Sequence, residues 1–262
     1  MLKANCPNRD ANVDIDSIIS EKYKGDIKTS LERLKALIKS RYQDYSRIEL
    51  GERIGPRSFS EEEKRAMHHL YDSQTATAKL ITAEVTRTYL LSLSGFCVSC
   101  GFGDADQIDH FLPQEHFPEF SILHKNLLPI CGTCNEIKGE NIPGMTKDYL
   151  HLMFDSIPNE EFLLCRITYN DHIPKSHFSV QARFQSDRIF RHFNDLKLST
   201  RLEKKSTQYF LQIRAFKNDL GDAFAIEEIE RDLQKTGVLF GTGYWKYLLC
   251  KEMISSNFVS KL

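Results

Sequence analysis

The sequence predicts an α+β fold that is mostly helical, with a cysteine-rich centre and a C-terminal β-hairpin followed by helices. Apolar residues recur at helical spacing in the first and last thirds of the chain. Between them, helical periodicity is lost where two CxxC pairs occur, and strict alternation of apolar and polar residues follows. We therefore expect three regions: a helical region over 1–95, a compact motif over 96–145, and a hairpin with helices over 146–262.

The N-terminal region predicts three helices. The first is expected where apolar side chains recur every three or four positions, at Ile27, Leu31, Leu34, Ile38 and Tyr45. Gly51, Gly55 and Pro56 then end it. Ser60 and Glu63 form a capping-box pattern that opens a second helix towards Tyr71, and a third is expected over 76–93.

The C-terminal region predicts a hairpin and then helices. Apolar residues alternate over 163–169 and again over 178–184, and the stretch 170–175, which contains Pro174, is expected to join the two strands. Helical periodicity returns around residues 189–196, 209–220 and 226–233, and a short last helix is expected over 245–253.

Composition excludes several classes of protein. The chain has 262 residues, of which 41% are hydrophobic, so it can bury a real core and is not disordered throughout. It has no apolar run of the ~18 residues that a spanning helix needs, and its polar start does not resemble a signal peptide. We therefore expect no membrane partner and a cytoplasmic location.

Four of the seven cysteines occur as two CxxC pairs, at Cys97 and Cys100 and at Cys131 and Cys134. Each pair can turn two thiolates towards one ion, and two pairs complete a tetrahedral sulfur shell, so structural zinc is the expected cofactor. Two disulfides, a redox dithiol or unrelated core cysteines are the alternatives. The other three cysteines, Cys6, Cys165 and Cys250, have no partner at ligand spacing and are expected to be ordinary small residues.

Further chemistry-bearing residues lie within this cysteine frame. In order, the segment reads CxxC, then DHxxP from Asp109, then Asn126, then CxxCNxxK ending at Lys138. This order resembles the HNH, or ββα-metal, nuclease family, and the resemblance is confined to the motif region. The size and layout are also loosely similar to the HNH subunits of bacterial anti-phage systems of the Septu type, which act with an ATPase partner.

The resemblance implies a role for each motif residue. Asp109 and Asn135 would hold one catalytic Mg²⁺ or Mn²⁺, His110 would be the general base, and Asn126 would brace the loop that orients the histidine. Lys138 is the expected phosphate contact. These residue types suit the reaction, because imidazole can take a proton from water near neutral pH and oxygen donors suit magnesium. Alternatively, Asn135 caps the following helix, and Lys138 offsets the helix dipole.

The expected function is therefore metal-dependent hydrolysis of phosphodiester bonds in DNA, in a bacterial defence or mobile-element context. An RNA-cleaving enzyme is one alternative, and a non-catalytic zinc module that binds nucleic acid or protein is the other. Two further histidines of the segment, His116 and His124, are expected to be exposed loop residues without a role.

Local charge bears on how a nucleic acid would be held. The net charge of the whole chain is only −1. Residues 97–141 contain seven acids and two bases, which should repel a phosphate backbone, whereas residues 22–57 contain ten bases and five acids. We therefore expect residues 22–57 or a partner subunit to supply affinity for the substrate, although a solvated helix face would have the same composition.

Overall fold

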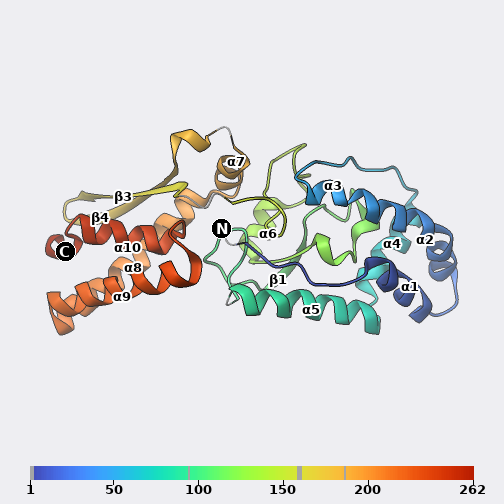
Figure 1. Ribbon diagram of the computed structural model, residues 1–262, viewed down its shortest axis with the longest axis horizontal. Coiled ribbons are helices and arrows are strands. Elements are labelled where there is room, and N and C mark those ends of the chain that lie inside the picture. The colour runs from blue at the N-terminus through green and yellow to red at the C-terminus, as the bar shows by residue number, and fades with distance from the viewer. Residues whose placement is uncertain (1–2, 94, 158–160, 186) are drawn as a thin grey trace. The chain divides into compact units, whose positions relative to one another are not determined.

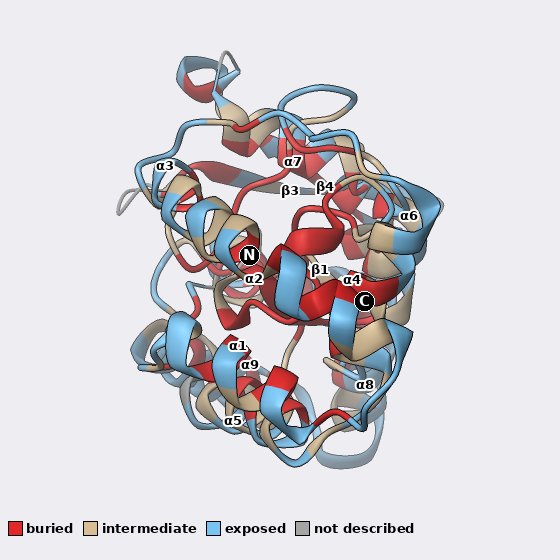
Figure 2. Ribbon diagram, turned by 90° about the vertical axis from the view of Figure 1, so that its right-hand side faces the viewer, coloured by how far each residue is buried: buried red, intermediate tan, exposed pale blue. Residues whose placement is uncertain are grey.

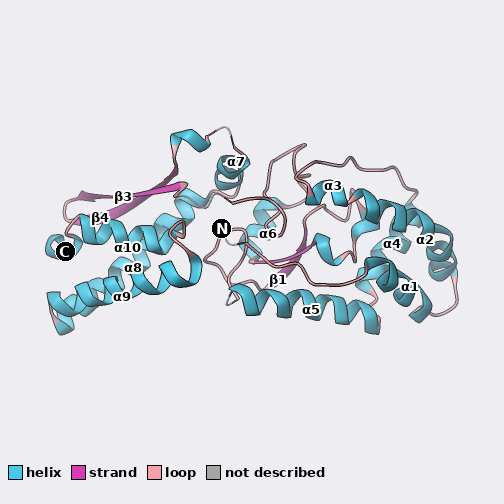
Figure 3. Cartoon of the chain, viewed as in Figure 1, coloured by secondary structure: helices cyan, strands magenta, loops and turns pink. Residues whose placement is uncertain are grey.

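The computed structural model describes residues 3–93, 95–157, 161–185 and 187–262. The chain divides into two compact units, unit 1 (Met1–Ser156) and unit 2 (Ile157–Leu262), and each is considered by itself (Figure 1). Both units mix helices with a two-stranded antiparallel sheet, as expected for an α+β chain (Figure 3). None of the helices in the described ranges has the length and apolarity needed to cross a bilayer.

Unit 1 contains the N-terminal helices and the motif region. Its helices are α1 (Ala11–Glu21), α2 (Asp26–Asp44), α3 (Ser46–Glu49), α4 (Glu61–Asp72), α5 (Ala76–Leu93) and α6 (Gly132–Lys138). Its strands are β1 (Gln107–His110) and β2 (Leu127–Ile130), with the short 3₁₀ helices η1 (Pro118–Phe120) and η2 (His124–Asn126) between them.

Local sequence explains where two of these helices begin. Asp10 caps α1 by accepting hydrogen bonds from the backbone amides of Asn12 and Val13. The predicted capping box of α4 is confirmed: the Ser60 hydroxyl accepts from the Glu63 amide, and the Glu63 carboxylate accepts from the Ser60 amide.

The N-terminal helices and the motif region share one hydrophobic core. Apolar residues of α1, α2, α4 and α5 pack together with Ile122 and Leu127 of the motif region. The helices are striped accordingly, with buried residues on one side and exposed residues on the other (Figure 2). The compact units consequently divide at 156/157, whereas the sequence suggested divisions at 95/96 and 145/146.

Unit 2 consists of a hairpin and packed helices. Its elements are β3 (Leu163–Asn170), β4 (Ile173–Val180), η3 (Ala182–Phe184), α7 (Arg188–Asp195), α8 (Leu198–Leu220), α9 (Asp222–Phe240), α10 (Trp245–Ser255) and η4 (Phe258–Lys261). The predicted hairpin is present, but its second strand spans 173–180 where 178–184 was expected, and Ala182–Phe184 is a 3₁₀ helix. Asp171 and His172 both have positive φ and form a tight two-residue turn, so Pro174 lies inside β4 opposite Tyr169. Proline is tolerated there because both strands are edge strands.

Candidate metal centre and catalytic pocket

The four motif cysteines come together in unit 1. All four are buried, and their sulfur atoms lie within 4.8 Å of one another, which confirms the predicted cluster. The Sγ atoms of Cys100 and Cys131 are 3.9 Å apart. Tetrahedral zinc with Zn–S bonds of about 2.3 Å would place its sulfur ligands about 3.8 Å apart, so the cluster has the dimensions of a zinc site.

The cluster favours a thiolate at Cys100 in particular, whereas hydrogen bonds with the neighbouring cysteines raise the pKa values of Cys97 and Cys134. Hydrogen bonds from the neighbouring thiols, that of Cys131 first, hold the pKa of Cys100 far below its ordinary value. The Gly103 amide also donates to the Cys100 sulfur at 3.3 Å. A Cβ atom at Gly103 would lie 2.9 Å from the Cys131 sulfur, so a side chain at this position would displace a ligand.

The close approach at Gly103 gives a first prediction. Gly103→Ala is expected to lower the zinc content of the purified protein and its thermal stability, because the added methyl group pushes Cys131 out of the shell. Gly55→Ala is the matched control, since a Cβ at Gly55 meets no atom within 4 Å. Metal analysis of both variants checks this, and equal zinc in the two would contradict it.

His110 lies at the end of β1, in a pocket of about 300 Å³. The pocket is lined by His68, Asp109, His110, Pro113, Gln114, Glu115, Lys138, Gly139 and Glu140. The Nε2 atom of His110 lies 2.8 Å from the carbonyl oxygen of Ser121. A carbonyl oxygen can only accept, so Nε2 carries the proton and Nδ1 keeps its lone pair. Burial lowers the pKa of His110 to about 4, which leaves the ring neutral near pH 7.

Asp109 and Lys138 form a buried ion pair beside His110. The Lys138 ammonium lies 2.9 Å from Asp109 Oδ1 and donates to the carbonyl of His110 at 2.7 Å. Burial raises the pKa of Asp109, and the lysine acts in the opposite direction. Lys138 thus lines the pocket, but its charge is directed at Asp109.

Asn135 lies one helical turn before Lys138 on α6, so both side chains face β1. Its amide donates to Gln107 Oε1 at 2.8 Å, two residues before Asp109 on the strand. Asn135 is not among the residues that line the pocket. The structure therefore brings Asp109, His110 and Lys138 together and directs Asn135 to Gln107.

Asn126 is fully buried and ties down the loop that follows His110. Its Oδ1 accepts from the Leu112 amide at 2.8 Å, and its Nδ2 donates to the carbonyls of Leu112 and Phe120 at 3.1 and 3.2 Å. The Tyr45 hydroxyl lies 3.1 Å from Asn126 Oδ1 and 3.1 Å from His151 Nε2. One side chain therefore bonds to the backbone of the loop between β1 and β2 at Leu112 and Phe120.

Three histidines take positions that the sequence did not indicate. His68 of α4 lines the pocket, where its Nε2 donates to the Gln114 carbonyl at 3.0 Å. His151 is buried in the Asn126 network. His124 was expected to be exposed but is 1% exposed, because η2 turns it into unit 1. The helical pattern that predicted α4 gave no sign that His68 would face the motif.

Two buried histidines of unit 1 outside the pocket, His124 and His151, make stability depend on pH. Burial lowers the pKa of His124 to about 4 and that of His151 to about 3, whereas both sit near 6.5 in the unfolded chain. The unfolded state therefore binds more protons below pH 6.5, and stability falls as the pH falls.

We expect the free energy of unfolding to drop between pH 6.5 and 4, by about 1.4 kcal/mol per pH unit for each histidine that titrates only on unfolding. Denaturant unfolding of the wild type and of His151→Gln over this range checks the sign and shows a shallower slope in the variant. Stability that rises as the pH falls would contradict it.

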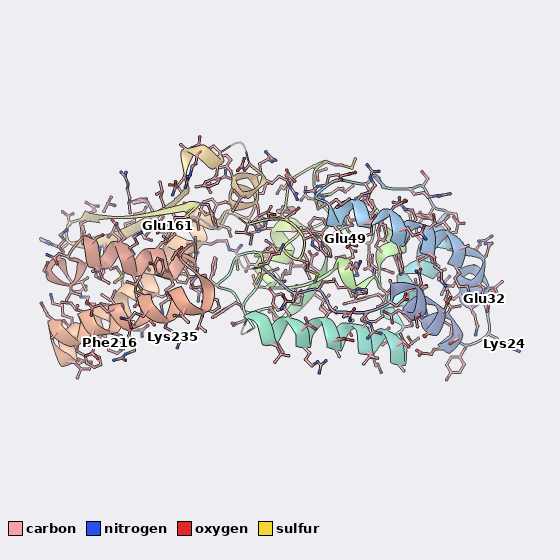
Figure 4. The ribbon with its side chains drawn as sticks, in the orientation of Figure 1. Lys24, Glu32, Glu49, Glu161, Phe216 and Lys235 are labelled. Atoms are coloured by element: carbon pink, nitrogen blue, oxygen red, sulfur yellow. The ribbon has the colours of Figure 1, made fainter. Side chains whose placement is uncertain are left out.

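The basic segment 22–57 is largely neutralised within unit 1. Six of its ten bases form ion pairs with acids: Arg33, Lys35, Lys39, Arg41, Arg47 and Arg53. Arg41, for example, pairs with the fully buried Glu119 at 2.8 Å. Glu49 of the same segment pairs with Lys125 of the motif region, with 2.6 Å between Lys125 Nζ and Glu49 Oε1. Figure 4 labels Glu49. Net charge along the sequence therefore overstates the positive surface available for a phosphate backbone.

Comparisons with known proteins add a partial likeness. No protein-family model matches the chain, and no solved structure matches it. Protein ea31 of Escherichia phage lambda is 48% identical over 54 residues, which are 19% of this chain and 18% of the phage protein. The chain thus matches less than a fifth of that relative's length.

Proposed function

We propose that the chain is a metal-dependent endonuclease that hydrolyses phosphodiester bonds in DNA, with His110 as the general base. The observation that supports this most is the hydrogen bond from His110 Nε2 to the Ser121 carbonyl. It fixes the neutral tautomer with Nδ1 as proton acceptor, at a pocket that also contains a buried carboxylate. The strand–strand–helix order around the cysteine cluster also agrees with the resemblance to HNH nucleases.

In this proposal the divalent cation, Mg²⁺ or Mn²⁺, is held by Asp109 and Asn135. A carboxylate and an amide oxygen are donors that magnesium accepts while keeping several waters. Asp109 reaches the pocket directly, whereas Asn135 would exchange its bond to Gln107 for the cation. When bound, the cation would neutralise charge on the scissile phosphate and stabilise the departing oxygen.

The side chains of the pocket would supply proton transfer and phosphate contact. His110 Nδ1 takes a proton from the attacking water, whose oxygen forms the new bond to phosphorus as the bond to the 3′ oxygen breaks. His68 projects into the same pocket from α4 and is our candidate for contacting the phosphate beside His110. Lys138 donates hydrogen bonds to the Asp109 carboxylate and the His110 carbonyl and so holds both in place. In this proposal it also contacts a phosphate.

Offering two substrates side by side tests the proposal. Supercoiled plasmid and a structured RNA are incubated with the zinc-loaded chain, with and without Mg²⁺ or Mn²⁺. We expect cation-dependent cleavage of the DNA, and the resemblance implies 5′-phosphate ends. Cleavage of RNA alone would replace DNA as the substrate. Zinc binding without cleavage of either substrate would favour a non-catalytic zinc module.

A partner subunit remains part of the proposal. The acids of residues 97–141 outnumber the bases, and both bases of that segment are engaged in ion pairs. Affinity for a polyanion must then come from outside the pocket, so we expect slow turnover by the chain alone at physiological salt. An ATPase of the kind found with HNH subunits of anti-phage systems is the partner that the resemblance suggests.

A further inference from the structure

Unit 2 presents a polar face on its two-stranded ribbon. Burial alternates along both strands, and the inner face packs against α8 and α10, which lie on one side of the hairpin (Figure 3). The outer face consists of eight exposed residues: Leu164, Arg166, Thr168, Asn170, Ile173, Lys175, His177 and Ser179. We call these residues the outer ribbon face.

The outer ribbon face is basic and contains no acid. Arg166 lies directly opposite His177, and Thr168 lies directly opposite Lys175, so Arg166 and Lys175 are diagonal neighbours across the two strands. The His177 ring nitrogen and the Thr168 hydroxyl are 2.9 Å apart on the diagonal. Around the basic residues, the hydroxyl groups of Thr168 and Ser179 and the amide of Asn170 supply further donors.

One basic residue of this face has an acidic neighbour. Lys175 Nζ lies 3.1 Å from Glu203 on α8, and the lysine side chain is 54% exposed. A pair at this level of exposure contributes little stability, so Lys175 can exchange Glu203 for another anion at small cost.

The helices of unit 2 mix bases with acids: α8, for example, contains five bases and two acids. Helix α9 contains five acids and two bases, and one of those bases, Arg231, pairs with Glu227 and Glu228. Asp171 lies in the turn of the ribbon, but the eight residues of the outer ribbon face include bases and no acid, unlike the mixed helices. In unit 1, most bases of residues 22–57 are already paired with acids.

From this arrangement we infer that the outer ribbon face is a binding surface for double-stranded DNA. A two-stranded antiparallel ribbon has the width to enter the major groove of B-DNA, which is about 12 Å wide. Eight residues per strand span roughly 25 Å at about 3.3 Å per residue, long enough to reach phosphates on both sides of that groove. The deep, narrow major groove of A-form RNA does not admit such a ribbon.

The inference depends on the proposed function only for the identity of the ligand, DNA. It assigns to unit 2 the affinity for DNA that the acidic motif region lacks. Arg166 and Lys175 would contact phosphates, and His177 with the hydroxyl and amide side chains would approach base edges or sugar oxygens. Binding and cleavage would then reside in different units of the chain.

The test measures binding in a protein that cannot cleave. The full-length, zinc-loaded His110→Ala chain is titrated into a labelled 30-base-pair DNA duplex, and into an RNA duplex of the same length, at several salt concentrations without added Mg²⁺. The same background then receives Arg166→Gln with Lys175→Gln. The matched control is Arg214→Gln with Lys235→Gln, which removes the same charge from exposed positions on α8 and α9; Figure 4 labels Lys235.

We expect the ribbon variant to bind DNA at least about tenfold more weakly and to lower the slope of log K against log salt by about 2, one unit for each lost phosphate contact. The control should stay within about twofold of its parent. Equal DNA binding by the ribbon variant and its parent would overturn the inference, as would equal losses of DNA affinity in the ribbon variant and the control. A parent that does not bind duplex DNA, or that prefers duplex RNA, would also overturn it.

These outcomes remain distinct from the fate of the proposed function. A chain that binds DNA through the ribbon but cleaves no nucleic acid would contradict the nuclease proposal and leave this inference standing. If the wild-type chain cleaves DNA but the ribbon variant binds DNA as tightly as its parent, the nuclease proposal stands and this inference is contradicted. Circular dichroism of each variant verifies that unit 2 is folded, since all four substituted residues are exposed.

Discussion

Replacing Cys134 by serine is expected to remove zinc from the protein and to unfold the motif region of unit 1. Cys134 is buried at the start of α6, in a cluster whose four sulfur atoms lie within 4.8 Å of one another. A hydroxyl is a poor zinc ligand, and without the ion the remaining thiols would sit buried and close together. Structural zinc supplies folding free energy on the order of 10 kcal/mol in small domains, comparable to the stability of a whole domain.

Metal analysis and hydrogen exchange measure this effect. We expect about one zinc per wild-type chain, almost none in the variant, and loss of protection in β1, β2 and α6, because these elements flank the cluster. Cys6→Ser is the matched control, since Cys6 is a half-buried cysteine of unit 1 outside the cluster. A Cys134→Ser protein with wild-type stability would show that the four cysteines are only core residues.

Replacing His110 is the second change with a large expected effect. General base catalysis contributes about 10² to 10⁴ to a rate, so His110→Ala should slow cleavage at least about a hundredfold. The zinc cluster should be unaffected, because His110 bonds to Ser121 and packs against Tyr71 and not against a cysteine. His110→Gln guards against a folding defect: its amide can still donate to the Ser121 carbonyl but cannot take a proton from water.

His116→Ala is the control for the histidine series. His116 belongs to the loop between Pro113 and η1 and is not among the residues that line the pocket. The His116→Ala protein should cleave DNA at the wild-type rate. Similar losses in His116→Ala and His110→Ala would point to a general effect on the loop and would remove the special role of His110.

Features set by short-range patterns were predictable from the sequence. The capping box at Ser60 and Glu63 depends on four adjacent residues, and it formed as predicted. The cysteine cluster was predictable because each CxxC spacing already places two thiols together, so only the meeting of the pairs depended on the fold. Helices α2 and α5 follow the apolar periodicity closely, whereas α8 begins at Leu198, well before the predicted 209–220, and α1 (Ala11–Glu21) was not predicted.

Features set by tertiary partners were not predictable. The turn of the hairpin was expected over 170–175, but it is confined to Asp171 and His172, two non-glycine residues that adopt the positive φ values of a tight turn. The burial of His124 and the bond of Asn135 to Gln107 depend on how η2 and α6 pack in unit 1. The ion pairs of residues 22–57 were not predictable for the same reason, since most of the acidic partners lie outside the segment.

The role of the pocket is tested most directly by the rate of plasmid cleavage. Zinc-loaded wild-type and His110→Gln proteins of equal metal content and equal thermal stability are compared on supercoiled DNA in Mg²⁺ under single-turnover conditions. The nuclease account predicts cation-dependent cleavage by the wild type and at least about a hundredfold slower cleavage by the variant. Equal rates in the two proteins, or no cleavage by a wild type that binds DNA, would contradict it.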